Sequence, residues 1–238
     1  MHPEEDADPD WVSALSGRSR TDSVRALEEA EGERRLYASL AREHEAEGRD
    51  SYVEIDAPLE LHALVRLIRP THVVEVGVSS GVSSAYLLQA LERNGHGTLH
   101  SVDLPSRPGR SRATGRPSQM SWSIPAGRAS GWAVPFALRK RWDLRLGDKA
   151  EVLPLLAEEL PRIDLFVYDV PHDDDRTRAE LARLDPVVPA GAVAIVDHGP
   201  GGGLCEALRI WGRSRGSEPV RRRELGLYGV RTRRSRPR

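Results

Sequence analysis

The sequence predicts an α/β fold in which a mostly parallel sheet carries helices on both faces and a β-hairpin closes the C-terminal end. Two observations predict it. Five short apolar runs alternate with longer segments of helical character, an order typical of parallel strands joined by helices. The first run leads directly into a loop that begins at Gly77 and ends at Gly81. A chain of 238 residues is long enough for one such domain with terminal additions.

The N-terminal part precedes the first predicted strand. Residues 1–20 are rich in charge, Ser and Pro and show no sustained periodicity, so we predict a disordered arm there. Residues 21–56 are predicted to form a helical segment, because apolar side chains are spaced among the charges as on an amphipathic helix. Another helix is expected to begin at Asp56, with Pro58 in its first turn. We therefore place the main domain at residues 57–232.

The first predicted strand, residues 73–76, organises the rest of this domain. Its residues are β-branched around one acid, which suits a strand buried on both faces. Gly77 and Gly81 let the backbone turn sharply and approach a ligand with no Cβ in the way. Residues 82–91 are mostly apolar or small, so this helix should lie against the sheet. Glu75 is costly to bury alone, so we expect it to meet a cation or several donors.

The remaining elements continue the alternation of strands and helices. Strands are predicted at residues 98–102, 142–146, 163–168 and 192–196, helices at 150–160, 171–184 and 204–211, and a hairpin at 220–224 with 227–232. Residues 105–139 interrupt the order with prolines, tryptophans and arginines, and we interpret this long insertion as a substrate lid. Residues 233–238 form a basic tail.

Composition argues against several classes of protein. The formal net charge of -1 argues against a dedicated nucleic-acid binder, and a nucleic-acid or membrane role for the basic tail is kept as an alternative. The single cysteine, Cys205, excludes an internal disulfide and a cysteine-rich zinc site. No signal peptide opens the chain, and no apolar stretch approaches the roughly 20 residues that span a bilayer. We therefore expect a cytoplasmic protein without a membrane or nucleic-acid partner.

Acids follow the predicted strands. They are Asp103, Asp148, Asp169 and Asp197. The carboxyl ends of parallel strands meet at one edge of a sheet, where ligands bind in folds of this kind. Asp103, after the second strand, can accept hydrogen bonds from the ribose hydroxyls of a nucleoside. An aspartate at any one turn is explained by turn formation alone, but four of them beside a glycine loop favour a binding site.

The pattern Glu75-x-Gly77-x-x-x-Gly81 resembles the first motif of class I S-adenosylmethionine-dependent methyltransferases. It departs from the dinucleotide fingerprint, which would need further glycines at positions 79 and 82. The resemblance implies a Rossmann-like methyltransferase fold and S-adenosylmethionine as cofactor. Carried over by position, it implies a cofactor site made of Glu75, Gly77, Ser79, Gly81, Asp103 and Asp148. Glu75 would then lie near the amino end of the cofactor's methionine part.

A second stretch, Asp169-Val-Pro-His172 with Asp197-His198, resembles the metal-dependent small-molecule O-methyltransferases. This resemblance implies methyl transfer to a hydroxyl oxygen of a small-molecule acceptor, with His172 as general base. It also implies a divalent metal, Mg²⁺ or another, held by Asp169, Asp197 and His198. His198 stands where the family has Asn or Asp, and imidazole favours softer metals than Mg²⁺.

Other interpretations of the same residues stay open. Asp169, His172 and His198 would also suit a two-histidine, one-carboxylate iron site, as in a non-haem hydroxylase on this fold. A non-catalytic relative that binds a nucleoside, or nothing, is a further alternative. His172 could simply cap a helix, and Asp103 could simply form a turn. The N-terminal helical segment is a candidate surface for a homodimer, and the acceptor is not encoded in any motif.

Overall fold

One sheet organises the computed structural model, which describes residues 7–46, 58–105, 124, 127–170, 174–197, 204–222 and 226–233. Within these residues its order is β3-β2-β1-β4-β5-β7-β6. The strands are β1 (His72–Val76), β2 (Thr98–Asp103), β3 (Trp142–Leu146), β4 (Leu165–Tyr168), β5 (Val193–Asp197), β6 (Val220–Arg221) and β7 (Leu227–Arg231). Strands β1 to β5 are parallel, and β7 runs antiparallel to β5 and β6. The predicted parallel sheet and closing hairpin are confirmed.

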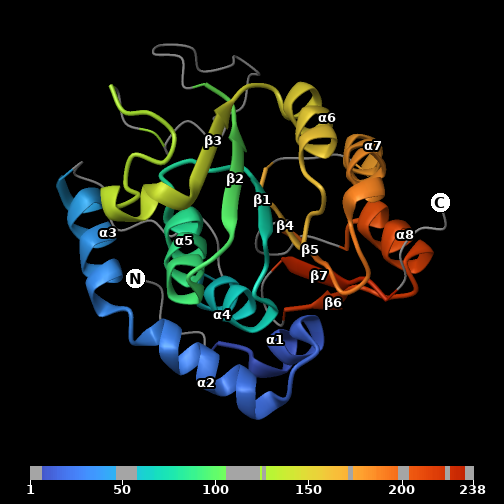
Figure 1. The fold of residues 1–238 in the computed structure, drawn as a ribbon, viewed down its shortest axis with the longest axis horizontal. Helices are drawn as coiled ribbons and strands as arrows, with labels where there is room; N and C mark the ends of the chain where they lie inside the picture. Colours follow the sequence, from blue (N-terminus) through green and yellow to red (C-terminus); the bar gives the residue numbers. More distant parts are fainter. Residues whose placement is uncertain are drawn as a thin grey trace.

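Helices cover both faces of this sheet (Figure 1). The helices are α1 (Pro9–Ser16), α2 (Arg20–Glu31), α3 (Arg34–Ala46), α4 (Pro58–Ile68), α5 (Val82–Asn94), α6 (Lys149–Glu159), α7 (Asp174–Leu184) and α8 (Glu206–Ser214), with short 3-10 turns η1 (Phe136–Arg141) and η2 (Asp185–Val187). None of these described helices combines the length and apolar character needed to cross a membrane.

Two hydrophobic cores lie on the two faces of the sheet, because successive side chains of a strand point to opposite sides. On β1, Val73 belongs to the core shared with α4 and α5. Its neighbour Val74 belongs to the core shared with α6, α7 and α8. Both valines are fully buried, as their β-branched run predicted.

The prediction of a disordered arm over residues 1–20 is wrong for residues 9–16, which form α1. Asp8 caps this helix by accepting hydrogen bonds from the backbone N–H groups of Asp10 and Trp11. Trp11 and Leu15 are buried, and the Trp11 indole N–H donates to the Val220 carbonyl at 3.0 Å. The helix was missed because it is short and its apolar face meets a hairpin that is distant in the sequence. Residues 1–6 lie outside the described part.

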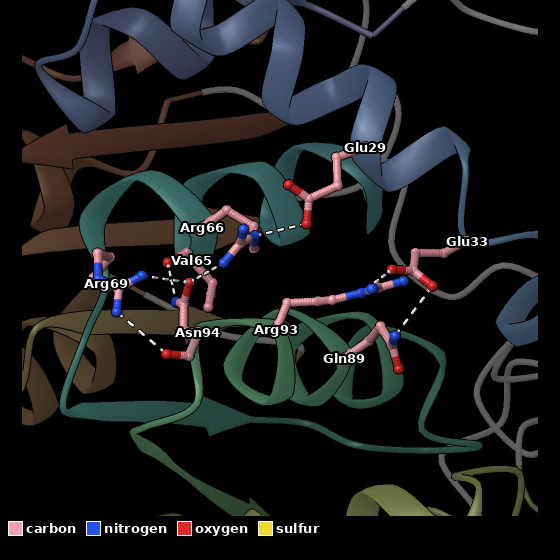
Figure 2. A network of polar contacts seen from close by, with 8 residues as sticks. All are labelled: Glu29, Glu33, Val65, Arg66, Arg69, Gln89, Arg93 and Asn94. Atoms are coloured by element: carbon pink, nitrogen blue, oxygen red, sulfur yellow. Dashed lines mark hydrogen bonds and ion pairs between the residues drawn. The ribbon is translucent and has the colours of Figure 1, made fainter.

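The predicted N-terminal helical segment is present as α2 and α3, while residues 47–56 fall outside the described range. Polar contacts join this helical segment to α4 and α5 (Figure 2). The Arg66 Nε atom lies 2.7 Å from Glu29 Oε1, and the Arg93 Nε atom lies 2.7 Å from Glu33 Oε1. The Asn94 amide donates to the Val65 carbonyl at 2.9 Å and joins α5 to α4. The N-terminal helices thus pack against the main domain, on the helix that follows the glycine loop.

Candidate active site

The glycine loop between β1 and α5 follows a path that only glycine fits at both ends. Gly77 and Gly81 have φ angles of +93° and +94°. A Cβ on Gly77 would lie 1.9 Å from the backbone oxygen of Asp169, and one on Gly81 would lie 2.5 Å from Cγ2 of Val134. The two glycines therefore let the loop pack closely against other parts of the protein, Gly77 against Asp169 and Gly81 against Val134.

The structure brings Ser79 and Asp103 into direct contact. Ser79 adopts a left-handed conformation with φ of +50°, which costs a non-glycine residue roughly 1 kcal/mol or more. Its backbone N–H then donates to Oδ2 of Asp103 at 3.0 Å. Oδ1 of Asp103 accepts from the backbone N–H of Leu104 at 2.8 Å. Each carboxylate oxygen has a second lone pair, so Asp103 retains capacity to accept from a ligand.

Glu75 lies beneath the loop, and its side chain is 0% exposed. Its carboxylate accepts hydrogen bonds from the hydroxyls of Ser83 at 2.7 Å, Ser84 at 2.6 Å and Ser101 at 2.7 Å. The prediction that it meets several donors is confirmed. Burial raises the pKa of the Glu75 carboxyl above its ordinary value of 4.5, the three hydroxyls oppose this rise, and the Asp103 charge adds to it.

Residues 131–134 pack against the glycine loop, a contact that the sequence did not predict. The backbone N–H of Gly131 donates to the Ser79 carbonyl at 2.8 Å, and that of Ala133 donates to the Ser80 carbonyl at 3.0 Å. Gly131 has φ of +71°, and a Cβ there would lie 2.1 Å from the Trp142 ring. These residues belong to the end of the predicted lid at 105–139, most of which lies outside the described residues.

The other strand-end acids differ in their surroundings. Asp148 is exposed and caps α6 by accepting from the backbone N–H of Ala150 at 2.9 Å. Asp169 follows β4, and its backbone N–H donates to the Val76 carbonyl at 2.9 Å. The register that pairs Tyr168 with Val196 sets Asp169 and Asp197 at neighbouring positions on adjacent strands. The structure therefore brings these two carboxylate-bearing positions to one edge of the sheet.

The histidines of the predicted site, His172 and His198, lie outside the described residues. The described residues contain no group of three or more His, Cys, Asp or Glu side chains that could hold a metal ion. The predicted metal ligands are Asp169 and Asp197, whose carboxylates are of the type that a hard cation prefers, and His198. The metal site and the general base both stay predictions.

The reversal of strand order at β1 and β4, the glycine loop after β1 and the antiparallel β7 beside β5 define the Rossmann-like fold of class I methyltransferases. A comparison with protein-family models agrees with this class. Residues 74–198 match the family described as a methyltransferase domain, which covers more than half of the chain. The chain belongs to this methyltransferase family.

Solved structures share its fold. The chain is similar to cofactor-bound Rv0187 from MTB, with a TM-score of 0.53 and 16% identity over 84% of this chain and 90% of that one. It is also similar to TomG, an O-methyltransferase from Streptomyces achromogenes in complex with SAM, with a TM-score of 0.52 and 17% identity over 83% and 89% of the two chains. At these identities the likeness shows the fold alone. No curated protein matches the sequence.

Proposed function

We propose that the protein transfers a methyl group from S-adenosylmethionine to a hydroxyl oxygen of a small molecule. The observation that carries this proposal is the 3.0 Å hydrogen bond from the Ser79 backbone N–H to Asp103, which holds the glycine loop against the carboxylate at the end of β2. In sheets of this kind nucleoside ligands bind in a crevice at the carboxyl ends of the strands, where this loop and this carboxylate lie. Membership of the methyltransferase family and the SAM bound to TomG support the choice of cofactor.

Each cofactor residue has a part that follows from its position. Asp103 would accept hydrogen bonds from the ribose hydroxyls, and the exposed Asp148 would lie near the adenine. Gly77 and Gly81 give the loop its path, and Ser79 holds the loop to Asp103 through its backbone N–H. Glu75 has no direct access to the crevice in the described structure, because its carboxylate is enclosed by hydroxyls of β2 and α5. We assign it the part of holding the start of α5 against β2.

The chemistry is a direct displacement at the methyl carbon. A lone pair of the acceptor oxygen forms the new C–O bond while the C–S bond breaks, and its electron pair stays on sulfur to give S-adenosylhomocysteine. The acceptor hydroxyl must also lose its proton. We assign that proton to His172, because a neutral imidazole is suited to accept one near neutral pH.

A divalent metal fits the acceptor side of this proposal. Asp169 and Asp197 occupy neighbouring positions at the ends of β4 and β5, and with His198 they would hold the ion. When bound, such an ion favours the ionised form of an acceptor oxygen. The family match favours methyl transfer over the iron-hydroxylase alternative, in which Asp169, His172 and His198 would hold the iron.

Titration calorimetry with S-adenosylhomocysteine tests this function. We expect binding to the purified protein and at least tenfold weaker binding to Asp103→Ala, since two charge-assisted hydrogen bonds to ribose are worth about 1.5–3 kcal/mol each. The control is Asp10→Ala, which removes an exposed carboxylate from α1. Binding of NAD with no heat from S-adenosylhomocysteine would overturn the assignment.

A further inference from the structure

A buried polar cluster joins α6, β4 and α7 near the carboxyl end of β4. The hydroxyl of Tyr168, a side chain that is 0% exposed, donates to Oε2 of Glu180 and accepts from Nζ of Lys149. Lys149 Nζ also donates to Glu180 Oε2 at 3.2 Å and lies 4.5 Å from the centroid of the Tyr168 ring. The Lys149 and Glu180 side chains are 18% and 7% exposed. Three polar side chains from three elements thus satisfy one another in the interior.

Stability alone is a weak reason for such a cluster. A buried ion pair loses much of its attraction to the cost of removing both charges from water, and apolar residues of similar volume often stabilise a fold as well. A central strand would accept an aliphatic residue at position 168. The cluster is therefore better explained by the positions that it fixes for α6, β4 and α7 relative to one another.

That geometry concerns the predicted site directly. Lys149 comes immediately after Asp148, and Tyr168 comes immediately before Asp169. The backbone oxygen of Asp169 in turn packs against Gly77, where a Cβ would lie 1.9 Å from it. A continuous set of contacts therefore leads from the Asp148 turn through Lys149 and Tyr168 to the glycine loop.

We propose that Tyr168, Lys149 and Glu180 are positioning residues that fix the Asp148 turn and the Asp169 backbone relative to the glycine loop, and so set the affinity for the cofactor without touching it. This inference rests on the proposed function, since it assumes that the crevice binds the adenosyl group. It assigns a role to residues that no motif of the sequence marks.

The test compares two matched substitutions. Tyr168→Phe removes only the bridging hydroxyl, and Tyr86→Phe removes a hydroxyl from another largely buried tyrosine, on α5. Calorimetry with S-adenosylhomocysteine should show about tenfold weaker binding for Tyr168→Phe, the loss typical of removing a supporting contact behind a binding residue. Tyr86→Phe should stay within about twofold of the wild type even where its loss of stability is similar. Equal affinities for the two variants would overturn the proposal.

Rescue at position 149 separates positioning from general stability. Lys149→Met should weaken S-adenosylhomocysteine binding as Tyr168→Phe does, and Lys149→Arg should recover most of the affinity because it keeps a cation beside Glu180. Binding that stays weak in Lys149→Arg, or full affinity in Lys149→Met, would contradict the proposal.

Hydrogen exchange without cofactor distinguishes a failure of this inference from a failure of the proposed function. In Tyr168→Phe the amides of Val152 and Asp169, which donate to the carbonyls of Asp148 and Val76, should exchange at least about fivefold faster than in Tyr86→Phe. If the wild type binds no S-adenosylhomocysteine, the proposed function fails. This exchange result still decides whether the cluster fixes the turn at Asp148 and the backbone of Asp169. Unchanged exchange at both amides would refute the positioning role.

Discussion

Gly77 and the backbone of Asp169 are in direct contact: a Cβ on Gly77 would lie 1.9 Å from the Asp169 carbonyl oxygen. The first turn of the glycine loop is therefore packed against the end of β4. Because β4 delivers Asp169 to the crevice, the same contact couples the proposed cofactor side of the site to its proposed acceptor side.

Gly77→Ala should destabilise the protein by about 3 kcal/mol or more, because the methyl group must displace the backbone of β4. Gly95→Ala is the matched control. Gly95 also has a positive φ, +74°, but a Cβ there would meet nothing within 4 Å. It should lose only the conformational cost of roughly 1 kcal/mol. Urea unfolding measures both losses, and equal losses would mean that the contact with Asp169 is not tight.

Glu75→Gln should change how stability depends on pH. The folded protein has a Glu75 pKa above 4.5, so the carboxyl binds its proton more readily in the folded state than in the unfolded chain. Its contribution is fully present below about pH 4.5 and is lost as pH rises through the folded pKa. Relative to Glu75→Gln, the wild type should therefore become less stable as pH rises.

Urea unfolding of the two proteins between about pH 4 and pH 8 measures this difference. A difference that stays constant over the range, or that grows in favour of the wild type as pH rises, would contradict the burial of Glu75 among hydroxyls.

His62→Leu should remove part of the loss of folding stability that occurs at acid pH. His62 on α4 is 0% exposed, and neither ring nitrogen has a hydrogen-bond partner among the described residues. Burial lowers its pKa from 6.5 to about 4, although Glu29 and Glu33 favour its charged form and Arg66 and Arg93 oppose it.

The neutral imidazole is therefore stable in the fold, and its contribution is present above about pH 6.5 and lost as pH falls through about pH 4. The wild type should lose about 3 kcal/mol over that interval from this group, and His62→Leu should not. Thermal or urea unfolding at several pH values compares them. Parallel acid losses in the two proteins would show that His62 is hydrated or paired.

Trp11→Ala should destabilise the protein by about 3–5 kcal/mol, as expected for truncating a buried aromatic side chain. The change also removes the donor to the Val220 carbonyl, which lies 3.0 Å away. Phe136→Ala is the control, because Phe136 is 89% exposed and its loss should cost within about 0.5 kcal/mol. A Trp11 variant as stable as the Phe136 variant would restore the prediction of a disordered arm.

The sheet was predictable from the sequence because its central strands are short runs of apolar and β-branched residues, and such runs suit strands covered on both faces. The glycine loop was predictable because a positive φ at Gly77 and Gly81 requires glycine. The resemblance assigned Ser79 and Asp103 to the same cofactor site, but the hydrogen bond between them was found only in the structure.

What the sequence could not predict depends on contacts between distant segments. Helix α1 is short, and its burial depends on a hairpin formed about two hundred residues later. Gly131 is required because the Trp142 ring lies against it, and nothing in the sequence indicates that these two residues are in contact. Lys149, Tyr168 and Glu180 meet only through the packing of three elements. His172 and His198 rest on resemblance alone, since both lie outside the described residues.

A crystal structure of the protein with S-adenosylhomocysteine tests the central claim most directly. We predict that the adenosyl ribose hydroxyls lie within hydrogen-bonding distance of Asp103, with the methionine part beside the loop from Gly77 to Gly81. A ligand bound elsewhere on the molecule, with that loop still closed against residues 131–134, would contradict the account.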